Sequence, residues 1–433
     1  MSDVAEVRLW GRTIGAVALQ AGSDVAGFEY DPAFVNSGIE IAPLTMPLSH
    51  RVFRFPELPR ETFYGLPGLL ADSLPDKFGH VLINAWLARR GRPPASMNAV
   101  ERLCYTGARG MGALEFRPTI GPRATRSRRL EVDALVELAS EVLTSRDRLH
   151  ATFDEDTSES AMADILRVGT SAGGARAKAV IAWNPETSEV RSGQVPVEEG
   201  FEHWILKFDG VRGNRDHELD DPRGYGAIEY AYHLMATAAG IDMAECRLFE
   251  ENGRRHFMTR RFDRDRNGSK RHMQSLCALA HYDYNLPGAY SYEQALQIIR
   301  RLDLGADAVE QQFRRMVFNL VARNHDDHVK NIAFLMDKRG QWRLSPAFDV
   351  TYSYNPEGDW TARHQMSVNG KREGFELGDL RACARNASMK RGRAEAILAE
   401  VNAAVVEWAR FADRADLPVE ITQRLARMHR DIH

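Results

Sequence analysis

A polar cluster between two apolar runs is the feature that most constrains how this chain can fold. Residues 313–321, before the cluster, carry apolar side chains at helical spacing, and residues 332–336 form a continuous apolar run of strand length. We therefore expect the cluster to lie in a loop between a helix and a buried strand, where a rigid scaffold can present it. The cluster consists of Asp326, Asp327, His328, Lys330 and Asn331.

The spacing within the cluster indicates phosphoryl transfer. Asp326 and Asn331 are separated as Asp-x4-Asn, the spacing of the protein-kinase catalytic loop, in which Asp accepts the substrate hydroxyl proton and Asn holds a metal ion. Asp349 follows Phe348, at a place suited to the Asp that carries Mg²⁺ on the phosphates of ATP. Val350 comes next instead of Phe-Gly, so the chain is not an ordinary eukaryotic-type kinase.

A solvated polar loop is the alternative interpretation, because a single Asp-x4-Asn spacing arises by chance in most long chains. Asp349 is a second acid of the required kind, joined to the cluster through a plausible strand. The pair of elements therefore favours a phosphotransferase site over the solvated loop.

The composition is that of a globular protein. The chain has 433 residues, which is long for a single core, so we expect two or three subdomains. Hydrophobic residues make up 44% of the chain and charged residues 27%. The net charge of −3 excludes a globally basic nucleic-acid binder, though not a local basic patch.

The sequence predicts a cytoplasmic protein that does not cross a membrane. No run approaches the roughly 18 consecutive apolar residues of a membrane span, and the polar, acidic start of the chain is unlike a signal peptide. The cysteines are scattered without a CxxC pair, which favours reduced thiols over disulfides or zinc. They are Cys104, Cys246, Cys277 and Cys383.

The N-terminal part has the pattern of a small α+β domain. Residues 7–19 alternate apolar and polar side chains and predict a β-hairpin. Residues 64–90 are predicted to be helical. A glycine-rich stretch at 106–113 fits neither a Walker loop nor a dinucleotide fingerprint, so we favour a tight structural connection over a phosphate cradle. Further short strands are expected at 26–30 and 44–48.

A second glycine-rich stretch and a strand lysine suggest a phosphate site. Small residues within 168–178 allow close backbone approach to a ligand, and they lead into an apolar strand at 179–183. We interpret this as a glycine-rich loop between two strands, as in kinases. Lys207 lies within an otherwise apolar strand, 203–208. A buried ammonium is costly without an anion, so phosphate contact is favoured over an edge lysine on a half-exposed strand.

The remaining segments fit the order of a kinase. Residues 227–240 predict a helix, on which Glu229 is a candidate partner for the strand lysine; a surface acid is the alternative. A hairpin is predicted across Asn252-Gly253, and residues 260–264 follow where the hinge between kinase lobes belongs. The rest, 291–433, is predicted to be mostly helical.

Five segments together resemble the HipA family of serine/threonine kinase toxins, and the likeness covers nearly the whole chain. The resemblance implies a bilobal, protein-kinase-like α+β fold: an N-terminal α/β lobe with an added small β-rich subdomain, and a mostly helical C-terminal lobe. The implied domains are 1–120, the N-terminal subdomain; 121–262, with the phosphate loop and strand lysine; and 263–433, the helical lobe. The segments are 170–178, 205–208, 261–264, 324–331 and 344–349.

The resemblance also implies roles for individual residues. Asp326 would be the catalytic base, Asn331 and Asp349 would hold Mg²⁺, and Ser171 would be autophosphorylated. A phosphate on Ser171 adds nearly two negative charges, which would silence the kinase because it could not share the site with ATP. The implied ATP-binding residues are Gly173, Gly174, Ala175, Arg176, Ala177, Lys178, Lys207, Arg260, Arg261, Phe262, His328, Lys330, Asn331, Phe348 and Asp349.

The resemblance further implies partners. These are a HipB-like helix-turn-helix antitoxin, operator DNA bound through the antitoxin complex, and an aminoacyl-tRNA synthetase substrate of the glutamyl-tRNA synthetase type. Basic residues within 385–393 either touch DNA phosphates in that complex or form a solvated helix end. Two alternative functions are a small-molecule phosphotransferase and a non-catalytic co-repressor that binds nucleotide.

Overall fold

The structure is a computed structural model, in which the chain forms two compact units. Unit 1 comprises Met1–Arg223, Phe249–Gln274 and Leu335–Gln341, and unit 2 comprises Gly224–Leu248, Ser275–Phe334 and Trp342–His433. The predicted loop residues Ser171, Gly173, Gly174 and Ala175 lie outside the described residues. The structure describes residues 3–75, 77–88, 90–121, 129–144, 164–166, 168–169, 176–194, 198–211, 215–216, 219–220, 224–265 and 267–433.

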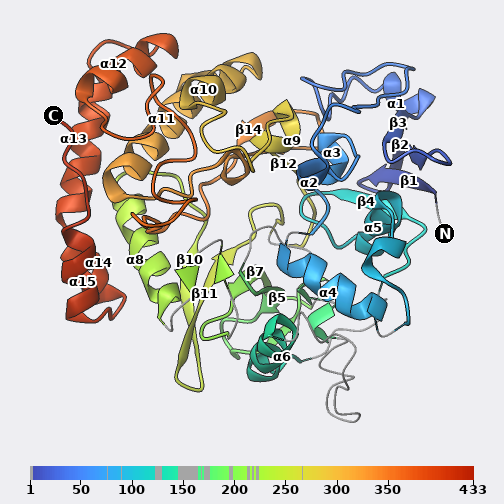
Figure 1. The fold of residues 1–433 in the computed structure, drawn as a ribbon, viewed down its shortest axis with the longest axis horizontal. Helices are drawn as coiled ribbons and strands as arrows, with labels where there is room; N and C mark the ends of the chain where they lie inside the picture. The colour runs from blue at the N-terminus through green and yellow to red at the C-terminus, as the bar shows by residue number, and fades with distance from the viewer. Residues whose placement is uncertain are drawn as a thin grey trace. The chain divides into compact units, whose positions relative to one another are not determined.

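Unit 1 begins with an antiparallel sheet of order β3-β2-β1-β4 (Figure 1). The predicted hairpin is confirmed, since β1 and β2 pair around a tight turn at Trp10 and Gly11, both with positive φ. Glycine at the second turn position adopts its φ of 82° without steric cost. The strands are β1 (Val4–Leu9), β2 (Arg12–Leu19), β3 (Ala26–Tyr30) and β4 (Leu114–Arg117).

Two predictions in this region are wrong. Residues 64–90 are not one helix, because Tyr64 and Gly65 take left-handed conformations and Pro75 precedes the last helical segment. Residues 44–48 form turns rather than a strand, with the N–H groups of Thr45 and Met46 donating to the carbonyl of Ala42. The short helices are α1 (Pro32–Val35), α2 (Arg60–Phe63), α3 (Gly68–Ala71), α4 (Lys77–Ala88), η1 (Pro94–Ser96) and α5 (Ala99–Thr106).

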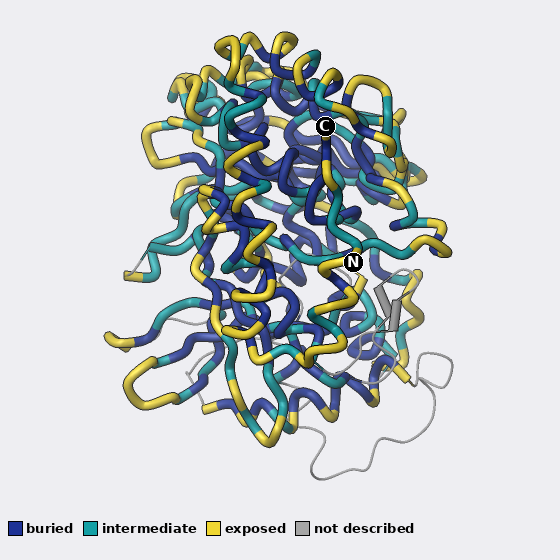
Figure 2. The backbone as a smooth tube through the Cα atoms, turned by 90° about the vertical axis from the view of Figure 1, so that its left-hand side faces the viewer, coloured by how far each residue is buried: buried dark blue, intermediate teal, exposed yellow. Residues whose placement is uncertain are grey.

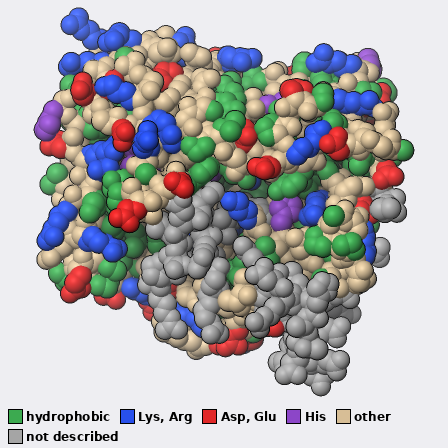
Figure 3. Space-filling view, viewed as in Figure 1, with side chains coloured by type: hydrophobic (Ala, Val, Ile, Leu, Met, Phe, Trp, Pro, Cys, Tyr) green, Lys and Arg blue, Asp and Glu red, His purple; other side chains and the backbone are tan. Residues whose placement is uncertain are grey.

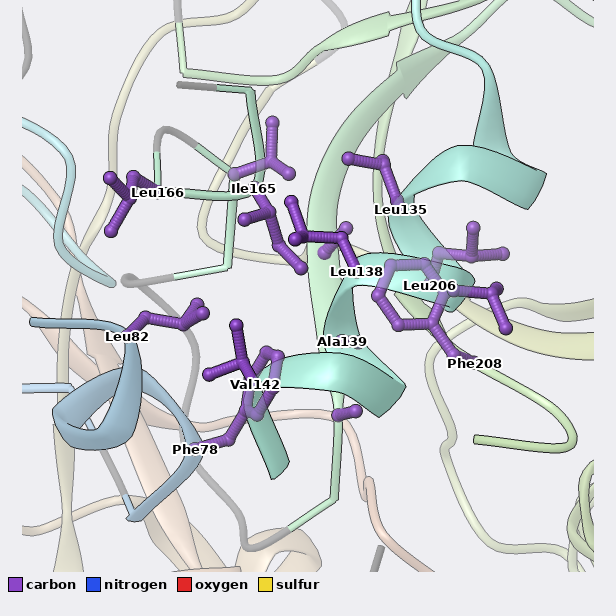
Figure 4. Packing of buried hydrophobic residues seen from close by; sticks show 14 of the residues in the cluster. Phe78, Leu82, Leu135, Leu138, Ala139, Val142, Ile165, Leu166, Leu206 and Phe208 are labelled. Carbon is purple, nitrogen blue, oxygen red and sulfur yellow. The ribbon is translucent and has the colours of Figure 1, made fainter. Parts of the chain in front are cut away.

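A five-stranded sheet of order β10-β11-β7-β5-β6 contains the predicted apolar strands and the predicted hairpin across Asn252-Gly253. Every residue of β5 is buried. Leu206 and Phe208 pack with Leu82 of α4 and Leu138 of α6 in one hydrophobic cluster (Figure 4). The elements are β5 (Lys178–Trp183), β6 (Val190–Ser192), β7 (Glu202–Lys207), β10 (Cys246–Glu251), β11 (Arg254–Arg260) and α6 (Val132–Thr144). A two-stranded ribbon joins β8 (Arg215–Asp216) and β9 (Leu219–Asp220).

Unit 2 holds most of the helical residues in the described part of the chain, including the helices predicted within 291–433. Its central helix, α11, buries Phe313, Met316 and Leu320 completely. Helix α13 buries Ile397, Leu398 and Val401, whereas α15 buries only Leu425; Figure 2 colours the backbone by burial. The helices are α8 (Tyr225–Ala238), α9 (Leu276–Ala280), α10 (Tyr292–Arg301), α11 (Gly305–Ala322), η3 (Val329–Asn331), α12 (Leu377–Asn386), α13 (Arg393–Val406), α14 (Trp408–Arg414) and α15 (Val419–Ala426).

A third sheet has the order β12-β13-β14. Its strands are β12 (His272–Ser275), β13 (Ala333–Met336) and β14 (Trp342–Leu344). On the face drawn in Figure 3, basic and acidic side chains are interspersed, in keeping with the small net charge. Within the described part of the chain, none of the helices has the length and apolar character needed to cross a bilayer.

Candidate active site

The polar cluster lies in the predicted loop between a helix and a buried strand. Helix α11 ends at Arg323, whose φ of 60° turns the chain out of the helix. Residues 324–328 have no regular structure, and the short η3 then leads into β13, whose four residues are all buried. The apolar runs on both sides are thus anchored in the core, and they fix the ends of the polar loop.

Asp326 is held by hydrogen bonds on its backbone and its side chain. Its N–H donates to Oγ of Ser353 (2.9 Å), and its carbonyl accepts from Nδ2 of Asn331 (2.8 Å). Oγ of Ser353 donates in turn to Oδ1 of Asn324 (2.9 Å). The indole N–H of Trp360 donates to Oδ1 of Asp326 (2.8 Å). The Asp326 side chain stays 27% exposed, so a fixed carboxylate faces solvent, as a general base requires.

The neighbouring Asp327 has the opposite environment. Its side chain is fully buried, with Oδ2 accepting from the hydroxyl of Tyr292 (2.7 Å) and Oδ1 from the N–H of Gln365 (2.8 Å). Nδ1 of the buried His364 lies 2.9 Å from Oδ2. These contacts tie the loop to α10 and to the segment around residue 364. Asp327 is therefore a structural carboxylate beside the partly exposed carboxylate of Asp326.

A buried histidine completes the underside of the loop. Nδ1 of His325 donates to the carbonyl of Thr361 (2.9 Å), and its ring lies 4.0 Å from that of His364. Burial, followed by the neighbouring His364, lowers the pKa of His325 far below its ordinary value. His325 is thus a neutral donor at neutral pH and holds the loop against residue 361.

His328 and Lys330 lie on the same loop as Asp326, and both are beside the aromatic ring of Tyr284. Nε2 of His328 is 3.7 Å from Oδ1 of Asp326. The Tyr284 ring lies 5.5 Å from the His328 ring, and Nζ of Lys330 is 5.0 Å from the centroid of Tyr284. Both predicted nucleotide contacts are therefore next to Asp326 in the fold and partly exposed.

Asn331 and Asp349 are the residues predicted to hold Mg²⁺. The hydrogen bond from Nδ2 of Asn331 orients its amide, which leaves the amide oxygen as the group it can offer to a cation. Asp349 has a φ of 53°, a left-handed conformation that is uncommon for a residue other than glycine and recurs at functional sites. No group of three or more His, Cys, Asp or Glu among the described residues could hold a metal ion. Mg²⁺ bound through one carboxylate, one amide and phosphate oxygens fits this donor set.

Two lysines face each other in unit 1. Lys178 of β5 pairs with Lys207 of β7, whose other neighbour is Phe257 of β11. Directly opposite residues share a face of the sheet, and Lys178 is only 2% exposed. The edge-strand alternative for Lys207 is wrong, because β7 is the central strand. Arg176 and Ala177 directly precede β5.

The predicted hinge residues end β11 and are bound to their own neighbours. The guanidinium of Arg261 forms two hydrogen bonds to Asp263 (2.9 and 2.7 Å), both side chains being fully buried. The N–H of Gly112 donates to the same carboxylate (2.7 Å). Burial alone would raise the pKa of Asp263, but Arg261 and Arg264 outweigh it and hold that pKa well below its ordinary value.

This arrangement gives the glycine-rich stretch at 106–113 the structural role predicted for it. The Asp263 carboxylate fixes Gly112, and a Cβ at Gly112 would lie 2.9 Å from the backbone nitrogen of Met273. Arg260 forms an ion pair with Glu202 (3.1 Å), and Phe262 follows Arg261 directly.

Two further predictions are corrected. Residues 164–166 and 168 are helical, so a helix rather than a strand precedes the second glycine-rich stretch. Glu229 in α8 is 2% exposed, so it is not the surface acid of the alternative interpretation.

Sequence reasoning missed three residues that hold Asp326 in place. Ser353 and Trp360 lie 27 and 34 positions beyond Asp326, outside any motif, and their contacts depend on tertiary structure. Asp327 stood inside the cluster without an assigned role. No local signal marked Asp327 as buried, because an aspartate is almost never fully buried unless it is paired, and its partners are distant in the sequence.

Two sequence profiles of known families match the chain. A profile described as the HipA-like C-terminal domain matches residues 170–409, more than half of the chain. A profile described as the HipA N-terminal domain matches residues 5–117.

Two curated relatives are named as kinases. "Putative kinase Y4mE" of Sinorhizobium fredii is 29% identical over 125 residues, which are 27% of this chain and 30% of the relative. A "Putative kinase" of Haemophilus influenzae is 28% identical over 168 residues, which are 35% of this chain and 49% of the relative. The matched segments thus span at most about half of these relatives.

Among solved structures, the chain resembles one from the Shewanella oneidensis toxin–antitoxin system HipA, HipB and its operator DNA complex. The TM-score is 0.67 at 16% sequence identity, over 98% of this chain and 94% of that chain. At this identity the likeness concerns the fold alone. It confirms the prediction of a bilobal, kinase-like α+β fold.

Proposed function

The chain belongs to the HipA family, and from that premise we propose that it is an ATP- and Mg²⁺-dependent serine/threonine-protein kinase acting as the toxin of a toxin–antitoxin module. The observation that carries the proposal is the hydrogen-bonded, partly exposed carboxylate of Asp326, in a loop that also presents His328 and Asn331. The kinase names of the two relatives support it.

In the proposed reaction, Asp326 accepts the proton of a serine or threonine hydroxyl. The hydroxyl oxygen bonds to the γ-phosphorus of ATP, the bond from that phosphorus to its bridging oxygen breaks, and ADP leaves with the electron pair. Asn331 and Asp349 would hold Mg²⁺, which neutralises charge on the phosphates when bound. Phe348, directly before Asp349, would line the nucleotide site.

The predicted phosphate loop, strand lysines and hinge would supply further nucleotide contacts. Lys178 and Lys207 would bind phosphate oxygens, because two ammonium groups on one face of a sheet suit a multiply charged anion. The segment from Arg260 to Phe262 would contact adenine through its backbone, since the Arg261 side chain is engaged by Asp263. The loop residues Gly173, Gly174 and Ala175, continuing into Arg176 and Ala177, would cover the phosphates. We also propose that the functional domains are 1–120, 121–262 and 263–433.

Regulation by phosphorylation of Ser171 also belongs to the proposal. Mass spectrometry after incubation with ATP and Mg²⁺ should find one phosphate on Ser171, and none in an Asp326→Asn protein. A phosphate found only at other residues would remove the case for autoinhibition through this loop.

The proposed partners follow from the family. A HipB-like helix-turn-helix antitoxin would bind the chain and carry the complex to operator DNA, in keeping with the composition of the similar Shewanella oneidensis assembly. The substrate would be an aminoacyl-tRNA synthetase of the glutamyl-tRNA synthetase type, whose modification in the cytoplasm would arrest growth.

Expression in bacteria with and without the adjacent open reading frame tests this function. We expect growth arrest without the neighbour, rescue with it, and a new phosphoserine or phosphothreonine on a synthetase in the arrested cells. ATP consumption with a small hydroxylated substrate and no protein acceptor would indicate a small-molecule phosphotransferase instead. Nucleotide binding without any turnover would indicate a co-repressor.

A further inference from the structure

We propose that Trp360 is a positioning residue for Asp326, and that Asp327 holds Trp360 in place. The inference rests on the proposed kinase function and extends it to residues outside the kinase motifs. Two adjacent aspartates then divide the work. Asp326 meets the substrate, whereas Asp327 anchors the segment that orients Asp326.

Trp360 contacts the Asp326 side chain directly. The indole N–H of Trp360 donates to Oδ1 of Asp326 at 2.8 Å. An indole N–H is a donor only, and a hydrogen bond to a carboxylate is stronger than one between neutral groups. Nε2 of His328 lies 3.7 Å from the same oxygen.

The backbone of Asp326 is held by two other residues. Ser353 fixes its N–H and Asn331 fixes its carbonyl, so the main chain is set from both sides. Rotation about the side-chain bonds is the freedom that these contacts do not remove. The Trp360 hydrogen bond acts on that rotation, and a rigid two-ring side chain limits it at a small entropic cost.

Gln365 links Trp360 to Asp327. The side-chain amide of Gln365 donates to the carbonyl of Trp360, and the backbone N–H of Gln365 donates to Oδ1 of Asp327 (2.8 Å). His364 contacts the other oxygen of Asp327. Asp327 is fully buried and also accepts from Tyr292 of α10. The segment that carries Trp360 is therefore fastened to the residue next to the catalytic one.

Steady-state kinetics of Trp360→Phe test the proposal. The substitution keeps an aromatic ring and removes the N–H, so we expect kcat to fall about 10- to 100-fold while KM for ATP changes less than about 3-fold. Trp408→Phe is the matched control, because the buried Trp408 in the same unit donates its indole N–H to the carbonyl of Thr422 (3.0 Å). The control should lose stability but keep kcat.

A spectroscopic measurement separates positioning from general stability. In the full chain labelled with 5-fluorotryptophan, the ¹⁹F resonance assigned to Trp360 by its loss in Trp360→Phe should move in Asp326→Ala. The resonance of Trp408 should stay in place in Asp326→Ala. If the chemical shift of the Trp360 resonance is unchanged in Asp326→Ala, the proposed hydrogen bond between Trp360 and Asp326 is wrong.

The kinetic outcomes separate the two proposals. If the wild-type chain transfers phosphate and Trp360→Phe keeps kcat, or loses no more than Trp408→Phe, the positioning role is wrong while the kinase function stands. If the wild-type chain transfers no phosphate to any protein, the proposed function is wrong and the positioning role falls with it.

Discussion

Lys178 lies directly opposite Lys207 in the antiparallel pair of β5 and β7. Like charges in directly opposed positions destabilise a sheet, and Lys178 is almost completely buried. Two ammonium groups on one face of a sheet can both make charge-assisted contacts to one multiply charged anion. The triphosphate of ATP is the anion that the proposed function supplies.

Removal of either lysine should therefore weaken nucleotide binding. In Lys178→Met and Lys207→Met we expect the affinity for ATP to fall at least about 10-fold, because each loses a charge-assisted contact. Isothermal titration calorimetry measures the affinity, and the rise in Tm on adding ATP should shrink in parallel. Lys338→Met, at an exposed turn, is the control. Equal affinities in all four proteins would contradict the phosphate role.

The buried network around Asp327 should stabilise unit 2. Asp327→Asn keeps the shape but replaces one acceptor oxygen by an N–H₂ group, facing donors from Tyr292, His364 or Gln365. We expect the free energy of unfolding to fall by about 1–3 kcal/mol. Denaturant unfolding measures it, with Asp413→Asn at an exposed position of α14 as the control. An unchanged midpoint in Asp327→Asn would show that these hydrogen bonds contribute no net stability.

Stability should fall as the pH drops through the range in which buried histidines titrate. Burial lowers the pKa of His256 to about 4, although the charge of Asp209 raises that pKa in part. Nδ1 of His256 accepts a hydrogen bond from the backbone N–H of Asp209 (2.8 Å), so the ring is neutral in the fold. Between about pH 6.5 and 4 the unfolded state binds more protons. The contribution of the neutral His256 ring to the free energy of unfolding is thus complete above about pH 6.5, and it is lost as the pH falls to about 4.

The pKa of His256 falls from its ordinary value of 6.5 to about 4 in the folded protein. At about 1.4 kcal/mol per pKa unit, this difference corresponds to about 3 kcal/mol of folding stability. His256→Asn keeps an acceptor near the position of Nδ1. The variant should be less stable than wild type at pH 7, and the gap should narrow by up to that amount at pH 4.5, measured by urea unfolding. A gap that is constant with pH would show that His256 titrates alike in both states.

The proposed magnesium site predicts how ATP binding depends on the metal. Asp349→Asn removes the charge and keeps a residue that tolerates a left-handed conformation. We expect wild type to bind ATP about 10-fold or more tightly with Mg²⁺ than with EDTA, and Asp349→Asn to show little difference. Calorimetric titration of ATP under both conditions measures this without relying on turnover. A wild-type Mg²⁺ effect that persists in the variant would assign the metal to other residues.

The elements that sequence analysis predicted are those fixed by short-range patterns. The hairpin of β1 and β2, the hairpin across Asn252-Gly253, and the helix, loop and strand around Asp326 all follow from local alternation, turn residues or helical spacing. Lys207 of β7 stood out because a charge interrupts an apolar run, whereas Lys178 of β5 was named only through the family resemblance.

The errors arose where backbone geometry or tertiary contacts decide. An apolar pattern runs through 64–90, but Tyr64 and Gly65 take left-handed conformations that end any helix there. The contacts of Ser353 and Trp360 with Asp326 join positions about 30 residues apart, which no local pattern encodes. The pairing of Lys178 with Lys207 required the strand order, since their separation in the sequence leaves it open.

Transfer of the γ-phosphate from ATP to protein, measured for wild type and Asp326→Asn, is the decisive test of Asp326 as the base of a protein kinase. Radiolabelled ATP with Mg²⁺, the chain itself and a panel of purified aminoacyl-tRNA synthetases provide the assay. We expect transfer by wild type and a loss of about 10²–10⁴-fold or more in Asp326→Asn, with the thermal unfolding of the two proteins alike. Transfer at the wild-type rate by a folded Asp326→Asn protein would contradict this expectation.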